Sequence, residues 1–175
     1  EKLYLATNHQ QAIETLHQLK PYAFCSDHLI AEPCNRNTAS AIGLLAQILV
    51  NKDPDAVMGI FPADHVVADS DKFINILQRA EALTQNDYLV TLGIPPARAE
   101  TGFGYLEKGA VVEGFEDTYR VKQFVEKPDL PAAKKYLEQG NHYWNCGVFV
   151  WKASIILEEL RQYAGNIHSQ LETIA

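Results

Sequence analysis

The apolar positions of this chain form two alternating patterns, short continuous runs and longer stretches with helical spacing. The short runs predict strands, because each is too short for a helix and stops at turn-forming residues; they cover 3–6, 28–31, 56–61 and 88–94. Stripes of apolar residues between the runs predict helices over 8–20, 38–49 and 70–83. Strands that alternate with helices favour parallel pairing with right-handed crossovers. The first two thirds of the chain therefore predict a doubly wound α/β sheet, in which the last two of these strands are buried.

Residues with capping or breaking chemistry mark several boundaries of these elements. Asn8 is a candidate N-cap for the first helix, and Asp69 or Ser70 is a candidate N-cap for the third. Pro62 ends the strand at 56–61, since proline has no N–H to donate to a sheet. These residues indicate that each predicted element stops where its apolar pattern stops.

After residue 96 the alternating units give way to a stretch that is richer in strands. The pattern predicts strands over 119–125 and 143–151, with a short helix between them that ends at Gly140. An amphipathic helix over 155–163 is the last predicted element. No element is expected after it.

Composition and charge limit the classes of partner. The apolar fraction of 47% allows a sizeable core, and the formal net charge of −7 argues against nucleic acid or an anionic membrane as the main partner. No apolar stretch approaches the roughly 20 residues needed to cross a bilayer. The three cysteines, Cys25, Cys34 and Cys146, form no C-x-x-C pair, so neither a disulfide framework nor a zinc site is expected. The expected location is the reducing cytoplasm.

Polar side chains lie at the predicted ends of several strands. Phe61-Pro62-Ala63-Asp64-His65 closes one strand, Glu126-Lys127 follows another, and Asn145 interrupts the last. Strand ends of this kind can converge on one rim of a sheet. An acid for a divalent cation, a lysine for a phosphate, and an acid with an amide for hydroxyl groups predict a metal-assisted site for a phosphorylated, hydroxyl-rich ligand. The plainer alternative is that Asp64 only closes a turn.

Two other stretches have chemistry that suits a ligand. Residues 32–38 form a polar loop that leads into a helix N-terminus, which is a favourable place for an anion or a polar ring edge. The alternative there is a capped helix with Arg36 in solvent. Gly102 and Gly104 flank an aromatic residue, so that a backbone could approach a ligand closely; the alternative is a bulge or turn.

Several strings of residues, taken together, resemble one enzyme family. They are Glu32-Pro33-x-x-Arg36-Asn37-Thr38, Phe61-Pro62-Ala63-Asp64-His65, Gly102-Phe103-Gly104-Tyr105, Phe124-Val125-Glu126-Lys127-Pro128 and Trp144-Asn145-x-Gly147-x-Phe149. In this order and spacing they resemble the mannose-1-phosphate guanylyltransferases, and among these most closely the bacterial type that is often fused to a phosphomannose isomerase domain. The resemblance implies a Rossmann-like nucleotide-diphosphosugar transferase fold of the GT-A-like kind, with a mixed, mostly parallel sheet and flanking helices.

The resemblance also implies a role for each matching residue. The guanine and ribose side of the nucleotide would contact Glu32, Pro33, Arg36, Asn37 and Thr38. Asp64 would hold a Mg²⁺ that bridges the nucleotide phosphates, and Lys127 would pair with the phosphate of mannose 1-phosphate. The mannose itself would contact Gly104, Glu126 and Asn145. The implied reaction forms GDP-mannose and pyrophosphate from GTP and mannose 1-phosphate, with Asp64 and Lys127 as catalytic residues.

The sequence departs from the family pattern at both ends. Family members begin with a glycine-rich segment, G-G-x-G-x-R-L-x-P, and carry a second metal-binding aspartate after the segment that matches Asn145; neither has a counterpart here. We therefore expect residues 1–175 to be a single partial nucleotidyltransferase domain, truncated at both ends, with little or no activity alone. An unpaired sheet edge is also expected, and with it marginal stability or self-association as a homo-oligomer. Cys146 stands where serine is usual in the family.

Two other functions fit the same residues. One is a nucleotidyltransferase for another base and sugar, such as a UTP- or dTTP-dependent enzyme that acts on glucose 1-phosphate. The other is a non-catalytic regulatory domain that binds a sugar nucleotide, for which the missing glycine-rich segment is the argument. Against the second stand Asp64 and Lys127, for which a purely regulatory domain has little use. The Arg36-Asn37-Thr38 string favours the guanylyl branch.

Overall fold

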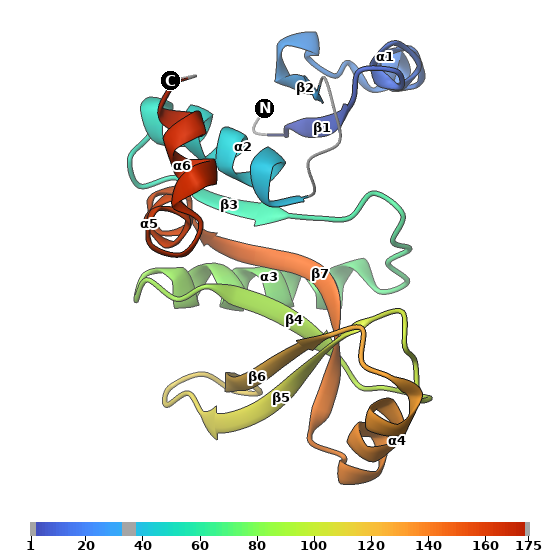
Figure 1. The fold of residues 1–175 in the computed structure, drawn as a ribbon. Coiled ribbons are helices and arrows are strands. Elements are labelled where there is room, and N and C mark those ends of the chain that lie inside the picture. The colour runs from blue at the N-terminus through green and yellow to red at the C-terminus, as the bar shows by residue number, and fades with distance from the viewer. Residues whose placement is uncertain (1–2, 33–37, 174–175) are drawn as a thin grey trace. The chain divides into compact units, whose positions relative to one another are not determined.

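The computed structural model describes residues 3–32 and 38–173 and divides the chain into two compact units. The first unit comprises Glu1–Asp53 with Leu157–Ala175, and the second comprises Pro54–Ile156. Each unit has its own strands and helices (Figure 1). The division concerns compactness alone, so the expectation of one partial domain over 1–175 stays a prediction.

The first unit begins with a two-stranded parallel sheet. It pairs β1 (Leu5–Asn8) with β2 (Leu29–Glu32), and the connection contains α1 (Ala12–Leu19) and two short 3-10 helices, η1 (Lys20–Tyr22) and η2 (Ser26–His28). The predicted helix start at Asn8 is wrong. Asn8 ends β1, and its side-chain oxygen accepts a hydrogen bond of 2.9 Å from the Gln11 backbone N–H. The Asn8 side chain therefore closes the turn before α1 and does not cap the helix.

Helices of the first unit pack closely at a glycine. The helices are α2 (Thr38–Lys52), α6 (Gly165–Glu172) and the end of α5 (Ala153–Tyr163), which begins in the second unit. A Cβ built on Gly43 of α2 would lie 2.5 Å from the Leu171 Cδ1 of α6, so a larger residue would require the Leu171 side chain to shift. The expectation that no element follows the helix at 155–163 is wrong, because α6 forms and buries Leu171 against α2.

The second unit is built on a five-stranded sheet with β7 at its centre. Its strands are β3 (Val57–Ile60), β4 (Val90–Ile94), β5 (Gly104–Val111), β6 (Tyr119–Glu126) and β7 (His142–Lys152). β7 pairs with β3, β4 and β5, and β5 pairs with β6 (Figure 1). The predicted α/β fold, with helices around a central mixed sheet, is confirmed at this level.

The prediction that the sheet is mostly parallel is wrong. In the described part of the chain, β1 with β2 is the one parallel pair, and every pairing in the five-stranded sheet is antiparallel. β3 and β4 do run in the same direction, but β7 lies between them in the opposite direction. Val150 of β7 consequently pairs with Gly59 of β3 and with Val90 of β4. The alternation of strands and helices predicts which elements form, but it does not reveal a later strand inserted between them.

β3 is less buried than its apolar sequence predicts. Met58 is buried, whereas Gly59 and, directly after the strand, Phe61 are exposed. The reason is its place in the sheet, since β3 pairs with β7 and with no other strand in the described residues. Within the second unit β3 therefore has one edge that pairs with no described strand, while an unpaired edge in the whole protein and self-association stay predictions.

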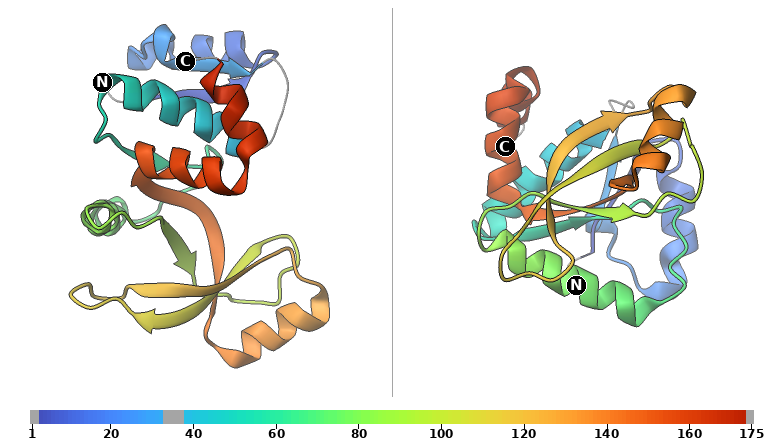
Figure 2. Two further views of the ribbon diagram at one scale, coloured as in Figure 1. Left: turned by 60° about the vertical axis from the view of Figure 1, so that its left-hand side comes forward. Right: turned by 90° about the horizontal axis from the view of Figure 1, so that it is seen from below.

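Two helices flank this sheet, and an aspartate side chain caps the start of each. They are α3 (Ser70–Thr84) and α4 (Leu130–Gln139). Asp69 and Asp129 each accept a hydrogen bond from the third N–H of their helix, at 3.0 Å and 2.9 Å. α4 ends at Gly140, whose φ of +68° suits a residue without a Cβ. α3 packs on β4 and β7, and α4 packs at the start of β7 (Figure 2). The predicted boundaries at Asp69 and Gly140 are confirmed.

A buried aromatic cluster joins α4 to the sheet. Tyr105 of β5 and Ala133 of α4 are fully buried, and Trp144 of β7 is 9% exposed. Because these side chains interlock, they fix the start of β5 against β7. The neighbouring residues Gly104 and Asn145 consequently have defined positions.

Candidate functional site

Three strands bring Gly104, Glu126 and Asn145 together. Gly104 opens β5 and lies opposite Glu126, the last residue of β6, in antiparallel register. A Cβ built on Gly104 would lie 2.6 Å from Glu126 Oε2 and 3.5 Å from Asn145 Cβ. The missing side chain at Gly104 thus leaves room for the carboxylate next to the strand that carries the amide. An acceptor-only carboxylate beside an amide suits a ligand with hydroxyl groups.

The Asn145 side chain is held by two hydrogen bonds. Its Oδ1 accepts from the Thr91 hydroxyl at 3.0 Å and from the Gly147 backbone N–H at 3.2 Å. Its Nδ2 has no partner among the described residues and is not one of their buried unpartnered atoms, so it is accessible. Thr91 was not among the predicted site residues, although a hydroxyl within the apolar run at 88–94 is the signal that could have revealed it.

Lys127 follows Glu126 in an unusual backbone conformation. Its φ is +47°, which is uncommon for a residue other than glycine, and its N–H donates to the Phe103 carbonyl oxygen at 3.2 Å. This bond ties the end of β6 to the glycine-containing turn before β5. The Lys127 side chain is 66% exposed, and its ammonium lies 3.9 Å from Glu126 Oε1, a loose ion pair that is too long for a hydrogen bond. The cation is therefore available to a phosphate.

The turn before β5 is organised by Glu100, which the sequence did not single out. Its Oε1 accepts from the backbone N–H groups of Thr101 and Gly102 at 3.0 Å and 3.1 Å, and its Oε2 pairs with Arg98. The hydrogen bond from the Gly102 N–H and, to a smaller extent, the one from Arg98 hold the pKa of Glu100 below its usual range. The Tyr105 hydroxyl closes the turn by donating to the Glu100 carbonyl oxygen at 2.9 Å. The ionised carboxylate thus shapes the loop that leads to the candidate site.

Asp64 lies on the turn after β3, with its side chain in solvent. The carboxylate makes no hydrogen bond or ion pair with another described residue. Two residues before it, Pro62 lies against β7: a Cβ built on Gly147 would come within 3.2 Å of Pro62 Cγ. This contact places the turn that carries Asp64 next to the segment of β7 that carries Asn145.

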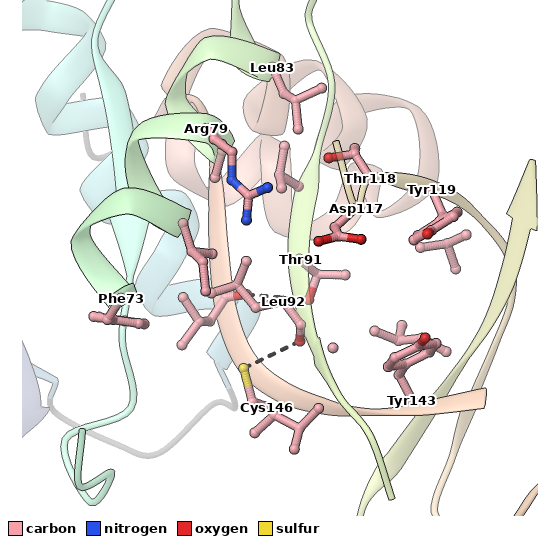
Figure 3. Close-up of a pocket in the computed structure, with 18 of the residues that line it drawn as sticks. Phe73, Arg79, Leu83, Thr91, Leu92, Asp117, Thr118, Tyr119, Tyr143 and Cys146 are labelled. Carbon is pink, nitrogen blue, oxygen red and sulfur yellow. Dashed lines mark hydrogen bonds between the residues drawn. The ribbon is translucent and has the colours of Figure 1, made fainter. Parts of the chain in front are cut away.

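A cavity of about 1310 Å³ is present in the second unit (Figure 3). It is lined by α3, β4, β7, the turn after β3 and the β5–β6 hairpin. Asp64 and Thr91 are among the lining residues. The other candidate residues do not line this cavity; they are Gly104, Glu126, Lys127 and Asn145. The predicted convergence of Asp64 with Lys127 and Asn145 therefore rests on the Pro62–Gly147 contact and not on a shared cavity. That they act on one ligand stays a prediction.

Cys146 also lines this cavity, and its thiol donates a hydrogen bond to the backbone. Figure 3 shows the Cys146 Sγ directed at the Leu92 carbonyl oxygen, to which it donates at 3.3 Å. Burial raises the pKa of this thiol, so it is neutral at physiological pH. A serine hydroxyl could donate the same hydrogen bond.

The residues predicted to contact guanine and ribose belong to the first unit. Glu32 ends β2, where its carbonyl oxygen accepts from the His9 N–H at 2.9 Å. Thr38 is the first residue of α2 and is exposed. Pro33, Arg36 and Asn37 lie outside the described residues. Their predicted role stays a prediction.

The candidate residues fit a metal ion only if the bound nucleotide supplies some of the atoms that coordinate it. Among the described residues, no three His, Cys, Asp or Glu side chains gather as a metal site. Mg²⁺ in phosphate-binding proteins is commonly held by one or two carboxylates together with substrate phosphates and water. The exposed, unpartnered Asp64 fits that arrangement and does not fit a metal cage made by the protein alone.

Comparison with known proteins identifies the family. A family profile described as nucleotidyl transferase matches residues 1–175, the whole chain. The chain belongs to the nucleotidyl transferase family. Within it, this nucleotidyl transferase chain is 38% identical over 182 residues to mannose-1-phosphate guanylyltransferase 2 of Escherichia coli O157:H7, covering 100% of the chain and 38% of that protein. It is 40% identical over 164 residues to mannose-1-phosphate guanylyltransferase of Escherichia coli K12, covering 91% and 34%.

A solved structure has the same fold. The Thermus thermophilus crystal structure described as mannose-1-phosphate geranyltransferase matches with a TM-score of 0.82 and 31% identity, over 98% of this chain and 48% of that one. The nucleotidyl transferase chain thus spans about a third of the curated relatives named above. The predicted resemblance and the predicted α/β fold with a central sheet and flanking helices are confirmed. In the segments that the structure describes, no helix combines the length and apolarity needed to cross a membrane.

Proposed function

We propose that the full-length protein is a mannose-1-phosphate guanylyltransferase, which forms GDP-mannose and pyrophosphate from GTP and mannose 1-phosphate. The observation that carries this proposal is the cluster of Gly104, Glu126 and Asn145, with the exposed Lys127 side chain beside it. Relatives that are named for this activity align with as much as 100% of the chain, which supports the same chemistry here.

In this proposal the cluster binds mannose 1-phosphate. The Glu126 carboxylate accepts hydrogen bonds from sugar hydroxyl groups, and the Asn145 Nδ2 donates one. Gly104 keeps the space between them open, since a side chain there would meet the carboxylate. Lys127 pairs with the phosphate, because its ammonium is exposed and has no hydrogen-bonded partner among the described residues.

The reaction is an in-line substitution at phosphorus. An oxygen of the sugar phosphate attacks the α-phosphorus of GTP, a bond from that oxygen to the α-phosphorus forms, and the bond to the leaving pyrophosphate breaks. Such a step needs positioning and charge neutralisation more than covalent chemistry from the protein. Lys127 holds the attacking phosphate and offsets its charge, which would otherwise repel the triphosphate.

Asp64 would hold Mg²⁺ together with the nucleotide phosphates. When bound there, the ion would neutralise phosphate charge and help to orient the triphosphate. On the nucleotide side, we propose that five residues contact guanine and ribose: Glu32, Pro33, Arg36, Asn37 and Thr38.

We also propose a cytoplasmic location and assembly as a homo-oligomer. The location is supported by the free thiols of Cys25 and Cys146, and the assembly by the unpaired edge of β3.

Turnover of the full-length protein tests the proposal. With Mg²⁺, GTP and mannose 1-phosphate, we expect release of pyrophosphate and formation of GDP-mannose. Lys127→Met should lower kcat/KM for mannose 1-phosphate about 10- to 100-fold, as expected for losing a charge-assisted bond to phosphate. Lys134→Met, on the exposed surface of α4, is the matched control and should keep normal turnover. A preference for UTP or dTTP with glucose 1-phosphate would overturn the guanylyl assignment. Tight binding of GDP-mannose without turnover would indicate the regulatory alternative.

A further inference from the structure

Thr91 of β4 reaches across the sheet to the Asn145 amide of β7. The two strands pair in antiparallel fashion, with a shift in register between Thr91 and Gly93. At this irregularity the Thr91 Oγ1 lies 3.0 Å from Asn145 Oδ1 and 3.3 Å from the Val148 carbonyl oxygen. Both side chains are half-buried. The hydroxyl has one proton, and the shorter contact is the one to Asn145.

The backbone decides which amide atom faces inward. The Gly147 N–H lies 3.2 Å from the same Asn145 atom. A backbone N–H can only donate, so that atom must be the oxygen, and a flipped amide would set two donors against each other. The hydroxyl of Thr91 adds a second donor to the same oxygen. The accessible branch of the amide is therefore Nδ2, which is a donor.

We propose that Thr91 is a positioning residue that, with the Gly147 N–H, fixes the Asn145 amide with its Nδ2 toward the ligand. This inference rests on the proposed function and sharpens it. A hydroxyl group can donate to the Glu126 carboxylate and at the same time accept from the Asn145 Nδ2. The pair thus recognises a group that is donor and acceptor together, as a sugar hydroxyl is. An amide in the opposite orientation would present two acceptors, and only a donor could satisfy them.

Kinetics of Thr91 variants test this role in the full-length protein. Thr91→Val keeps the shape and removes the hydroxyl; we expect KM for mannose 1-phosphate to rise about three- to tenfold, while KM for GTP is unchanged. Thr91→Ser keeps the hydroxyl and should restore the wild-type value. Thr118→Val is the matched control, because among the described residues the Thr118 hydroxyl bonds to the Glu116 carbonyl oxygen in the β5–β6 hairpin and not to Asn145. Equal increases in both KM values, or no rescue by serine, would overturn the proposal.

A double-mutant cycle separates positioning from a general effect on the fold. In an Asn145→Ala background the hydroxyl has no amide to orient, so Thr91→Val should cause no further rise in KM for mannose 1-phosphate. A further rise as large as in the wild type would contradict the proposal.

NMR of the Asn145 side chain keeps this inference distinct from the proposed activity. With selective ¹⁵N-asparagine labelling, the Asn145 NH₂ signals should shift or broaden in Thr91→Val and stay in place in Thr91→Ser and Thr118→Val. If they do so in a protein that turns over no sugar phosphate, the proposed function fails and the positioning role stands. If they are unchanged in Thr91→Val, the positioning role fails whatever the activity.

Discussion

Pro62 packs on Gly147, with its Cγ 3.2 Å from the place where a Cβ on that glycine would lie. Gly147 also has a φ of +74°, in the left-handed region that favours glycine. The contact joins the turn that carries Asp64 to the strand that carries Asn145. This contact therefore fixes the proposed metal-binding turn next to the strand that carries the proposed sugar-binding residue.

Gly147→Ala should disturb this junction in two ways. The left-handed φ costs about 1 kcal/mol for a residue with a Cβ, and the new methyl group presses on Pro62. We expect a lower melting temperature and, because the turn that carries Asp64 moves, a higher Mg²⁺ concentration for half-maximal turnover. Gly114→Ala separates the two causes, since Gly114 has a φ of +81° and nothing within 4 Å of its would-be Cβ. If both variants behave alike, the Pro62 contact contributes nothing.

Gly104→Ala should weaken sugar binding and leave the fold intact. The new Cβ would meet the Glu126 carboxylate at 2.6 Å and the edge of the exposed Phe124 ring at 3.0 Å, and both side chains can move away at little cost to stability. The displaced carboxylate would lose its bonds to the sugar, so KM for mannose 1-phosphate should rise about tenfold or more, with little change in melting temperature. Gly102→Ala is the control, because its Cβ would make an ordinary contact of 3.5 Å with Glu100. A large drop in melting temperature for Gly104→Ala would show that the glycine serves packing instead.

The helix boundaries at Asp69 and Gly140 could be predicted from sequence, whereas the start of the first helix and the direction of the strands could not. Asp69 and Gly140 act through neighbouring backbone groups, so their roles are visible in a few consecutive residues. The pairing of β3 and β4 with β7 depends on a strand that comes much later in the chain. For the same reason the sequence indicated Asn145 but not Thr91, which lies 54 residues before it and contacts it only through the sheet.

His142 should make the second unit less stable in mild acid. It is 5% exposed, its Nδ1 has no hydrogen-bond partner in the described part of the chain, and its ring stacks on Tyr136 at 4.2 Å. Burial lowers the pKa of His142; the nearby Glu107 raises it and Lys122 lowers it, but neither outweighs burial. Below the usual histidine pKa of about 6.5 the unfolded chain therefore binds more protons than the folded one, and stability falls as the pH drops.

Melting temperatures at pH 7.5 and 5.5 test the role of His142. His142→Phe keeps an aromatic ring against Tyr136 and removes the titration, so its loss of melting temperature on acidification should be smaller than that of the wild type. His17→Gln, at an exposed position on α1, should lose as much as the wild type. An equal loss in all three proteins would mean that His142 does not contribute to the acid sensitivity.

Cys146 should resist alkylation although it lines a cavity. Its thiol donates to the Leu92 carbonyl oxygen, and burial raises the pKa of the thiol, so little of the reactive thiolate is present at neutral pH. Cys25 is exposed and should react with iodoacetamide much faster. Peptide mapping by mass spectrometry after timed labelling at pH 7.5 distinguishes the two sites.

Substitutions at Cys146 test the hydrogen bond itself. Because a serine hydroxyl can donate to the same carbonyl oxygen, Cys146→Ser should keep the melting temperature and turnover of the wild type. Cys146→Ala leaves that oxygen without its donor and should be less stable by about 1 kcal/mol. Rapid labelling of Cys146 in the folded protein would contradict this account of the thiol.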